Sequence, residues 1–153
     1  FEAARSFTRW ELNRLEARAG AAAVVAALPW IGAWRPEGTL AASSPQLASD
    51  GRDLHGEARV EWRQAAVALS QVRPLGSYRA DIRAHGPGAK IDVATLDGPL
   101  RLSGEGTLTL PARLEFAGEA RAEGPNAAAL APLLDLLGPR RADGARALKW
   151  IAR

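Results

Sequence analysis

The chain has 153 residues, enough for one domain built around one hydrophobic core. Acidic and basic side chains alternate and nearly balance at a net charge of +3, which argues against nucleic-acid binding, because nucleic-acid binders gather basic residues on one face. The lack of cysteine excludes disulfides and thiolate metal sites, and no apolar run reaches the roughly 18 residues of a membrane-spanning helix. The sequence starts at Phe1 and contains no methionine, so we expect a fragment of a longer product that carries any anchor or targeting segment.

The N-terminal portion, about residues 10–48, is predicted to hold a strand, a short helix and a second strand. Trp10–Ala19 fits either a strand or a helix, and we favour a strand from its apolar residues at positions 10, 12, 15, 17 and 19. Ala21–Leu28 is typical of a short helix that ends at Pro29. Gly38–Ala48 is the second predicted strand.

Residues 56–122 alternate between apolar and charged side chains, which predicts a sheet with one buried face and one wet face. Short turns rich in glycine and proline, such as Gly86–Gly88, leave no room for crossover helices, so the strands should form an antiparallel meander. Lys90–Thr95, Leu100–Leu110 and a last strand from Pro111 belong to it. The side chains expected on its buried face are Ala58, Val60, Trp62, Tyr78, Ala80, Ile82, Ala84, Leu100, Leu102, Leu108, Leu110, Leu114, Phe116, Ala120 and Ala122.

Two local features of the meander carry further predictions. Gly104 and Gly106 interrupt a strand, which usually marks a bulge or bend, so we expect the sheet to curve there. Trp62 is expected to end its strand and to fill the space between the sheet and an end helix.

A C-terminal helix is predicted over about residues 126–137. Leu130, Leu133, Leu134 and Leu137 follow helical spacing, and Gly138 stands where a helix commonly stops. Pro132 within the helix would cost about 3 kcal/mol, so the helix should begin near Ala131. We expect its leucines to pack on the sheet in preference to a partner or a membrane surface. The Arg140–Arg141 pair suits a helix C-terminus or a solvated tail.

Together these patterns predict a mainly β fold: a curved, half-barrel-like antiparallel meander with short helices at its ends, residues 1–153 forming a single domain.

No group of residues forms a pattern that carries chemistry. His55 and His85 are placed in turns, and neither has a second metal ligand at a suitable spacing. Asp50, Asp53 and Glu57 are read as a solvated polar loop. The Gly104-Glu105-Gly106 triplet lies between two strands, whereas phosphate-binding loops lead into a helix. We therefore predict no catalytic, cofactor-binding or metal-binding residues, and no enzymatic activity.

From about residue 28 onward the sequence resembles the type II secretion system protein N family. The segments that carry the resemblance are Trp62-Arg63-Gln64-Ala65, Leu69-Ser70-Gln71-Val72-Arg73-Pro74-Leu75-Gly76-Ser77-Tyr78, Gly98-Pro99, Leu100-Arg101-Leu102, Gly104-Glu105-Gly106 and the leucine-rich stretch 130–138. We regard Trp62, Arg63, Leu69, Ser70, Pro74, Leu75, Gly76, Tyr78, Gly98, Pro99, Gly104 and Gly106 as its structural signature. Their order resembles the C-terminal part of that family's periplasmic region.

The resemblance implies an accessory component of type II secretion at the periplasmic face of the bacterial inner membrane. It implies partners among the outer-membrane secretin and the inner-membrane platform, and contact with the membrane only through an N-terminal anchor absent from this chain. It supplies no catalytic residues.

Two functions fit the predicted sheet, and we give enzymatic activity the last place. A scaffold or adaptor would bind other secretion proteins through an edge strand or the concave face. A lipid-binding half-barrel would hold acyl chains on the apolar face, because residues that face a core and residues that face a lipid follow the same pattern.

Overall fold

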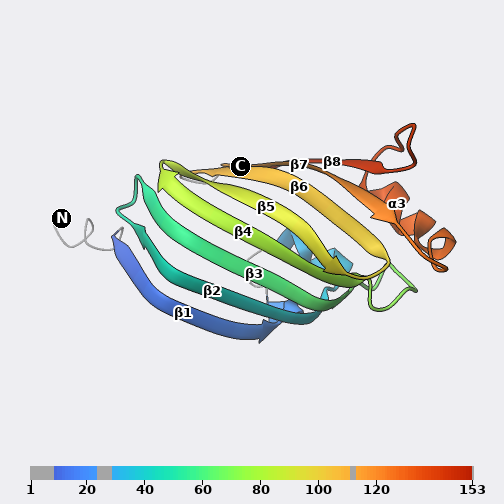
Figure 1. Cartoon of the computed structure of the whole chain (residues 1–153), viewed down its shortest axis with the longest axis horizontal. Helices are drawn as coiled ribbons and strands as arrows, with labels where there is room; N and C mark the ends of the chain where they lie inside the picture. The colour runs from blue at the N-terminus through green and yellow to red at the C-terminus, as the bar shows by residue number, and fades with distance from the viewer. Residues whose placement is uncertain (1–8, 24–28, 111–112, 153) are drawn as a thin grey trace.

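A computed structural model describes residues 9–23, 29–110 and 113–152, and it forms one open eight-stranded antiparallel sheet (Figure 1). The spatial order follows the chain from β1 to β8, so each strand pairs with its neighbour in sequence. The strands are β1 (Trp10–Gly20), β2 (Glu37–Ser49), β3 (Leu54–Ala66), β4 (Gly76–Gly86), β5 (Gly88–Asp97), β6 (Leu100–Thr109), β7 (Arg113–Ala122) and β8 (Arg146–Ala152). The predicted mainly β antiparallel meander is confirmed.

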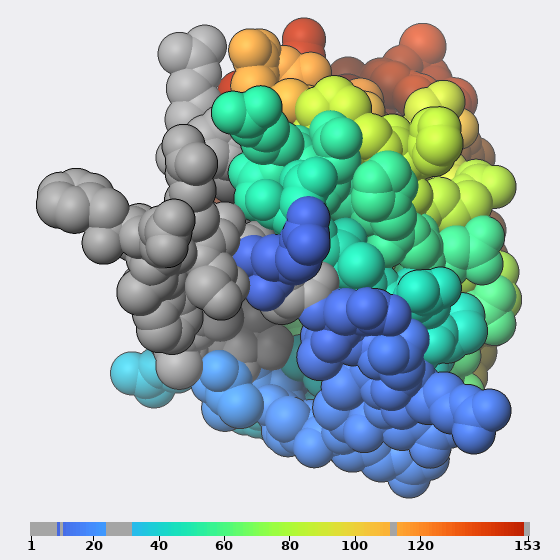
Figure 2. Space-filling model, turned by 90° about the vertical axis from the view of Figure 1, so that its left-hand side faces the viewer, coloured from blue at the N-terminus to red at the C-terminus, as the bar shows by residue number. Residues whose placement is uncertain are grey.

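The two edges of the sheet lie on opposite sides of the molecule. β1 lies at the bottom of Figure 1 and β8 at the top. Seen from one end, the colours of the chain run upward from the blue of β1 to the orange and red of the C-terminal elements (Figure 2). The described residues therefore present two separate free strand edges.

The short helices occupy the ends of strands. They are the 3-10 turns η1 (Ala21–Ala23), η2 (Pro29–Trp34) and η3 (Ala128–Leu130), and the α-helix α3 (Ala131–Leu137). The predicted start of the C-terminal helix at Ala131 is confirmed, because Pro132 fits the first turn, where the backbone N–H needs no partner. Among the described residues, no helix combines the length and apolar character needed to cross a bilayer.

The predicted helix over residues 21–28 is wrong where it can be compared. Residues 21–23 form a single 3-10 turn, and residues 24–28 lie outside the described part of the chain. Pro29 begins η2 rather than ending a helix. The fixed backbone angle of proline is as compatible with the first residue of a helical turn as with a stop.

The prediction that the strand after Pro111 is the last one is also wrong, because β8 pairs with β7 along Leu114–Ala120. The local pattern of β8 is weak, since apolar residues occur at both parities in its seven residues. This segment becomes a strand because it pairs with β7, and that pairing forms only when the chain folds. Arg140, predicted to be in a helix end or a tail, forms an isolated bridge with Arg146.

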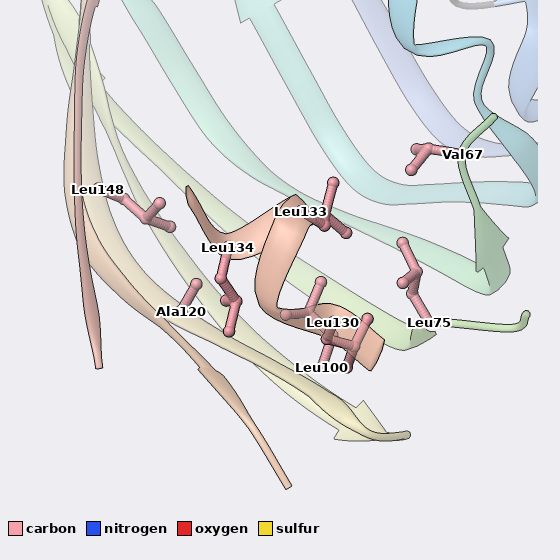
Figure 3. Packing of buried hydrophobic residues seen from close by; sticks show 8 residues of the cluster. All are labelled: Val67, Leu75, Leu100, Ala120, Leu130, Leu133, Leu134 and Leu148. Carbon is pink, nitrogen blue, oxygen red and sulfur yellow. The ribbon is translucent and has the colours of Figure 1, made fainter. Parts of the chain in front are cut away.

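One face of the sheet carries the hydrophobic core, and we call it the inner face. Leu130, Leu133 and Leu134 from the helical segment pack on Leu100, Ala120 and Leu148 of the sheet, and Val67 and Leu75 of the β3–β4 loop complete the cluster (Figure 3). The predicted packing of the helix on the sheet is thus confirmed. A smaller cluster of Leu54, Ala84 and Ala89 lies toward the other end of the strands.

Register shifts occur at β2 and β3, whereas the glycines of β6 keep the register with β7. Shifts occur between Ser43 and Gln46 on β2 and between Trp62 and Ala65 on β3. β6 pairs with β7 in continuous register through Gly104 and Gly106, so these glycines form no bulge there. They allow the aromatic ring of Phe116 to approach the strand closely.

Candidate interaction surface

Most of the signature residues meet at one end of the sheet. β3 ends in the loop that carries Leu69, Ser70 and Pro74, and this loop returns to the sheet through Leu75. The backbone of Leu75 links two strands: its N–H donates to the carbonyl of Ala65 at 2.7 Å, and its carbonyl accepts from the N–H of Leu100 at 3.0 Å. The Oγ of Ser70 accepts from the N–H of Val72 at 3.1 Å, which closes the loop.

Tyr78 joins this cluster from the buried side. The residue is 5% exposed, and its hydroxyl donates to the carbonyl of Leu100 at 2.8 Å. Burial raises the pKa of Tyr78 well above its usual range. Gly98, followed by Pro99, turns β5 into β6, and a Cβ on Gly98 would collide with the backbone of Gly76. These contacts fix three strands together.

Trp62 packs on the same core, but it does not end its strand. β3 continues to Ala66 after a register shift, with Gln64 at a φ of 53°. The indole Nε1 of Trp62 donates to the carbonyl of Glu37 at 2.9 Å, and its ring lies 6.1 Å from that of Tyr78. Arg63 is exposed and pairs with Glu61 at 2.7 Å. That these residues form the family signature stays a prediction.

Gly104 and Gly106 lie apart from this cluster, under an aromatic ring. A Cβ on Gly104 would stand 2.5 Å from Cζ of Phe116, and one on Gly106 would stand 3.2 Å from Cδ2 of the same ring. The ring of Phe116 therefore lies over both glycines of β6. Trp150 of β8 is its cross-strand partner, with ring centroids 5.6 Å apart.

A row of inner-face residues thus crosses the sheet and ends at its free edge. Register pairs Ile82 with Ile91, Ile91 with Gly106, Gly106 with Phe116, and Phe116 with Trp150. Trp150 is 46% exposed, and the next residue, Ile151, is 56% exposed on the opposite face. Large apolar side chains that remain this open at a sheet edge are typical of interaction sites.

The outer face of the sheet is lined with charged side chains. Arg59 of β3 pairs with Asp81 of β4 at 2.7 Å, and Arg83 of β4 pairs with Asp92 of β5 at 2.7 Å. Such exposed pairs contribute about 0–1 kcal/mol each. They make this face soluble and give it mixed charge, as the alternating pattern predicts.

One group of charges ties the segment before β8 to β7. Asp143 lies 2.8 Å from Arg141 and 3.1 Å from Arg121, and it accepts from the N–H of Ala145 at 3.1 Å. The hydrogen bond from Arg141, followed by that from Ala145, lowers the pKa of Asp143 to about 2. The turn that leads into β8 is therefore held by the ionised carboxylate of Asp143.

An open depression of about 830 Å³ borders β8, and its lining includes Phe116 and Trp150 beside outer-face residues. Charged residues of both signs, among them Lys90, Glu105, Glu115 and Lys149, line it together with Ile151. Small-molecule sites are usually concave and mostly apolar. This mixed-charge lining fits contact with another protein better than a cofactor.

The two histidines are not in turns, which corrects the prediction. His55 lies in β3 and His85 in β4, directly opposite each other with ring centroids 6.1 Å apart. Strand pairing extends beyond the apolar stretch from which the strands were predicted. In the part of the chain that the structure describes, no three potential metal ligands lie close enough together to hold an ion.

Asp50 holds its own loop in shape. Its carboxylate accepts from the N–H groups of Arg52 and Asp53 at 2.9 and 2.8 Å, and these bonds lower its pKa. Asp53 and Glu57 do not join it in a cluster of carboxylates. Asp50 and Asp53 thus lie in a turn outside the strands, whereas Glu57, predicted to share this polar loop, lies in β3 opposite Arg83.

The sequence interpretation missed the edge at β8. Its signals were present: Trp150 and Ile151 are adjacent large apolar residues beside Lys149, next to residues of weak strand pattern. They could be recognised as a surface only once the strand order was known.

The fold and this surface define a class of protein: an open antiparallel sheet with an apolar inner face, a charged outer face and an apolar free edge. The particular family follows from comparison. The chain belongs to the type II secretion system protein N family, whose model matches residues 1–149. The match includes residues 1–27, whereas the sequence resemblance begins only at about residue 28. No curated protein and no solved structure matches the chain.

Proposed function

We propose that the chain is a non-enzymatic accessory component of type II secretion that binds other proteins of the machinery as a scaffold or adaptor. The family match over residues 1–149 carries this proposal. By the same reasoning, the protein acts at the periplasmic face of the inner membrane, and its partners are the secretin and the inner-membrane platform.

The arrangement of polar groups supports a binding role rather than catalysis. Tyr78 donates to a backbone carbonyl, Asp50 caps a turn, and Asp143 pairs with two arginines. Each of these groups stabilises the fold, and each is satisfied by neighbouring protein atoms.

The alternative of lipid binding has less support. α3 and the β3–β4 loop fill one end of the inner face. The exposed large apolar residues of that face among the described residues are Leu12 on β1 and Trp150 on β8, at the two edges. The inner-face residues between the two edges, such as Val60, Ile82 and Ile91, are half-buried, so an acyl chain would find only a partly open strip there. Native mass spectrometry of the purified chain should accordingly show no retained lipid, and a stoichiometric lipid would favour the alternative.

Retention of purified partners tests the proposal. The immobilised chain, with its fold verified by circular dichroism, is incubated separately with the periplasmic domains of the secretin and of the platform proteins. We expect at least one domain to be retained at 150 mM salt. A folded chain that retains none of them would contradict the adaptor function.

A further inference from the structure

We propose that the free edge of β8 accepts an extended strand from another secretion component, and that this strand carries acidic residues on its outer face and apolar residues on its inner face. The inference rests on the proposed function and deepens it by naming the edge and the chemistry of the partner. It begins from a difference between the two edges of the sheet.

The edge at β1 is protected against strand addition. Arg14 has a φ of 53° and is left out of the pairing with β2, so the backbone of the strand is distorted there although the register on either side is unchanged. Glu16 and Arg18 add exposed charges of opposite sign. Charged side chains on an edge strand are one of the devices by which natural sheets prevent pairing there.

The edge at β8 carries no mixture of charges and is free from Leu148 onward, since the N–H of Ala147 already donates to the carbonyl of Pro139 at 3.1 Å. It pairs with β7 in continuous register, and all described residues of the strand are free of proline and of acidic side chains. Trp150 extends the inner-face row one strand beyond Phe116. An incoming strand would cover Trp150 with an apolar side chain and continue the row.

The charge of β8 selects the partner. Arg146 is already paired with Asp135 of α3 at 2.6 Å, and its side chain is largely buried. Lys149 points to the outer face and forms no ion pair within the described part of the chain. Opposite charges at facing positions of neighbouring strands stabilise a sheet, so the position facing Lys149 favours Glu or Asp.

The same charges disfavour a second copy of the chain. Two β8 strands placed side by side would bring basic residues toward basic residues without an acidic side chain in either strand. The β1 edge of a second copy is distorted at Arg14, whose φ is 53°, and so offers poor pairing. A different protein with an alternating acidic and apolar strand meets both requirements.

Binding of a designed peptide tests the edge directly. The probe is the fluorescent peptide acetyl-Val-Glu-Val-Glu-Val-Glu-Val-amide, and its counterpart carries Lys in place of Glu. We expect the Glu peptide to bind the full chain at least about tenfold more tightly than the Lys peptide at low salt. Hydrogen exchange should slow in residues 148–152 and stay unchanged in residues 10–20.

Two matched variants locate the site. Lys149→Glu should reverse the peptide preference, because the facing charge is inverted, and Arg18→Glu on β1 should leave it unchanged. Equal binding of both peptides, protection of β1 instead of β8, or an unchanged preference in Lys149→Glu would overturn the proposal.

The partner domains are tested in parallel so that the two hypotheses can fail separately. Binding at the β8 edge is supported if the wild-type chain retains a domain that Lys149→Glu loses, or if the Glu peptide displaces that domain. Domains retained equally by both chains, with no peptide bound, overturn the edge and leave the adaptor function standing. Peptide binding without any retained domain supports the edge and contradicts the adaptor function. A dimer that disappears in Ile151→Lys would overturn the proposal, since the occupant would be a second copy.

Discussion

Substituting Gly104 with alanine tests the packing that supports the β8 edge. The new Cβ would lie 2.5 Å from Cζ of Phe116, 2.7 Å from the carbonyl oxygen of Ala117 and 2.8 Å from Cα of Gly118, where ordinary contacts are 3.4–4 Å. Two of these atoms belong to the backbone, so the clash cannot be relieved by rotating Phe116 alone. Overpacking of this kind costs about 1–3 kcal/mol, which exceeds the roughly 0.8 kcal/mol gained by burying one methyl group.

Urea and thermal unfolding measure the cost. We expect Gly104→Ala to lower Tm by about 4–8 °C for a loss of about 2 kcal/mol. Gly20→Ala is the matched control, because it also adds a methyl group within the sheet but meets no atom within 4 Å. Equal stability of the two variants would refute the close approach of Phe116 to β6 and, with it, the row that ends at Trp150.

Three further predictions concern the core and the polar contacts. Tyr78 is the single tyrosine of the chain, so absorbance titration should show no phenolate at pH 10–11 while the protein stays folded. Because the pKa of Tyr78 is raised in the folded state, its contribution to stability is full below about pH 10 and is lost as the pH rises. Asp143→Asn should lower the urea midpoint at pH 6 and not at pH 2, because a carboxyl whose pKa is lowered to about 2 stabilises the fold above about pH 4 and loses this effect on acidification. The same drop in urea midpoint at both pH values would argue against the Arg141 pairing. Leu133 is 2% exposed, so Leu133→Ala should cost about 2–5 kcal/mol in urea unfolding, whereas Leu136→Ala on the same helix, at a residue 61% exposed, should cost less than about 0.5 kcal/mol. Similar losses in the two variants would contradict the packing of α3 on the sheet.

The sequence was sufficient to predict the meander because alternation is a local property of each strand. Val60 and Ile82 lie on the inner face as predicted, since each strand buries alternate residues whatever its neighbours are. The start of α3 was also predictable, because proline has a strong positional preference in helices. Element ends were less accurate, as the extension of β3 and β4 to the two histidines illustrates.

The candidate interaction surface could not be predicted in the same way, because it depends on relations between strands. Gly104 suggested a bend, and only the cross-strand register reveals that it makes room for Phe116. Trp150 and Ile151 become an edge only because β8 pairs with β7 and with no other strand in the described part of the chain. No local pattern distinguishes an edge strand from a central one of similar composition.

Site-specific photocrosslinking in cells with an active secretion machinery tests the central claim most directly. A photoreactive amino acid is placed at Lys149 or Ile151 on β8 and, for comparison, at Glu11 or Arg18 on β1. We expect crosslinks from the β8 positions to the secretin or to a platform protein, and none from β1. Crosslinks that come from β1 alone, or from neither edge while the chain accumulates normally, would contradict the account.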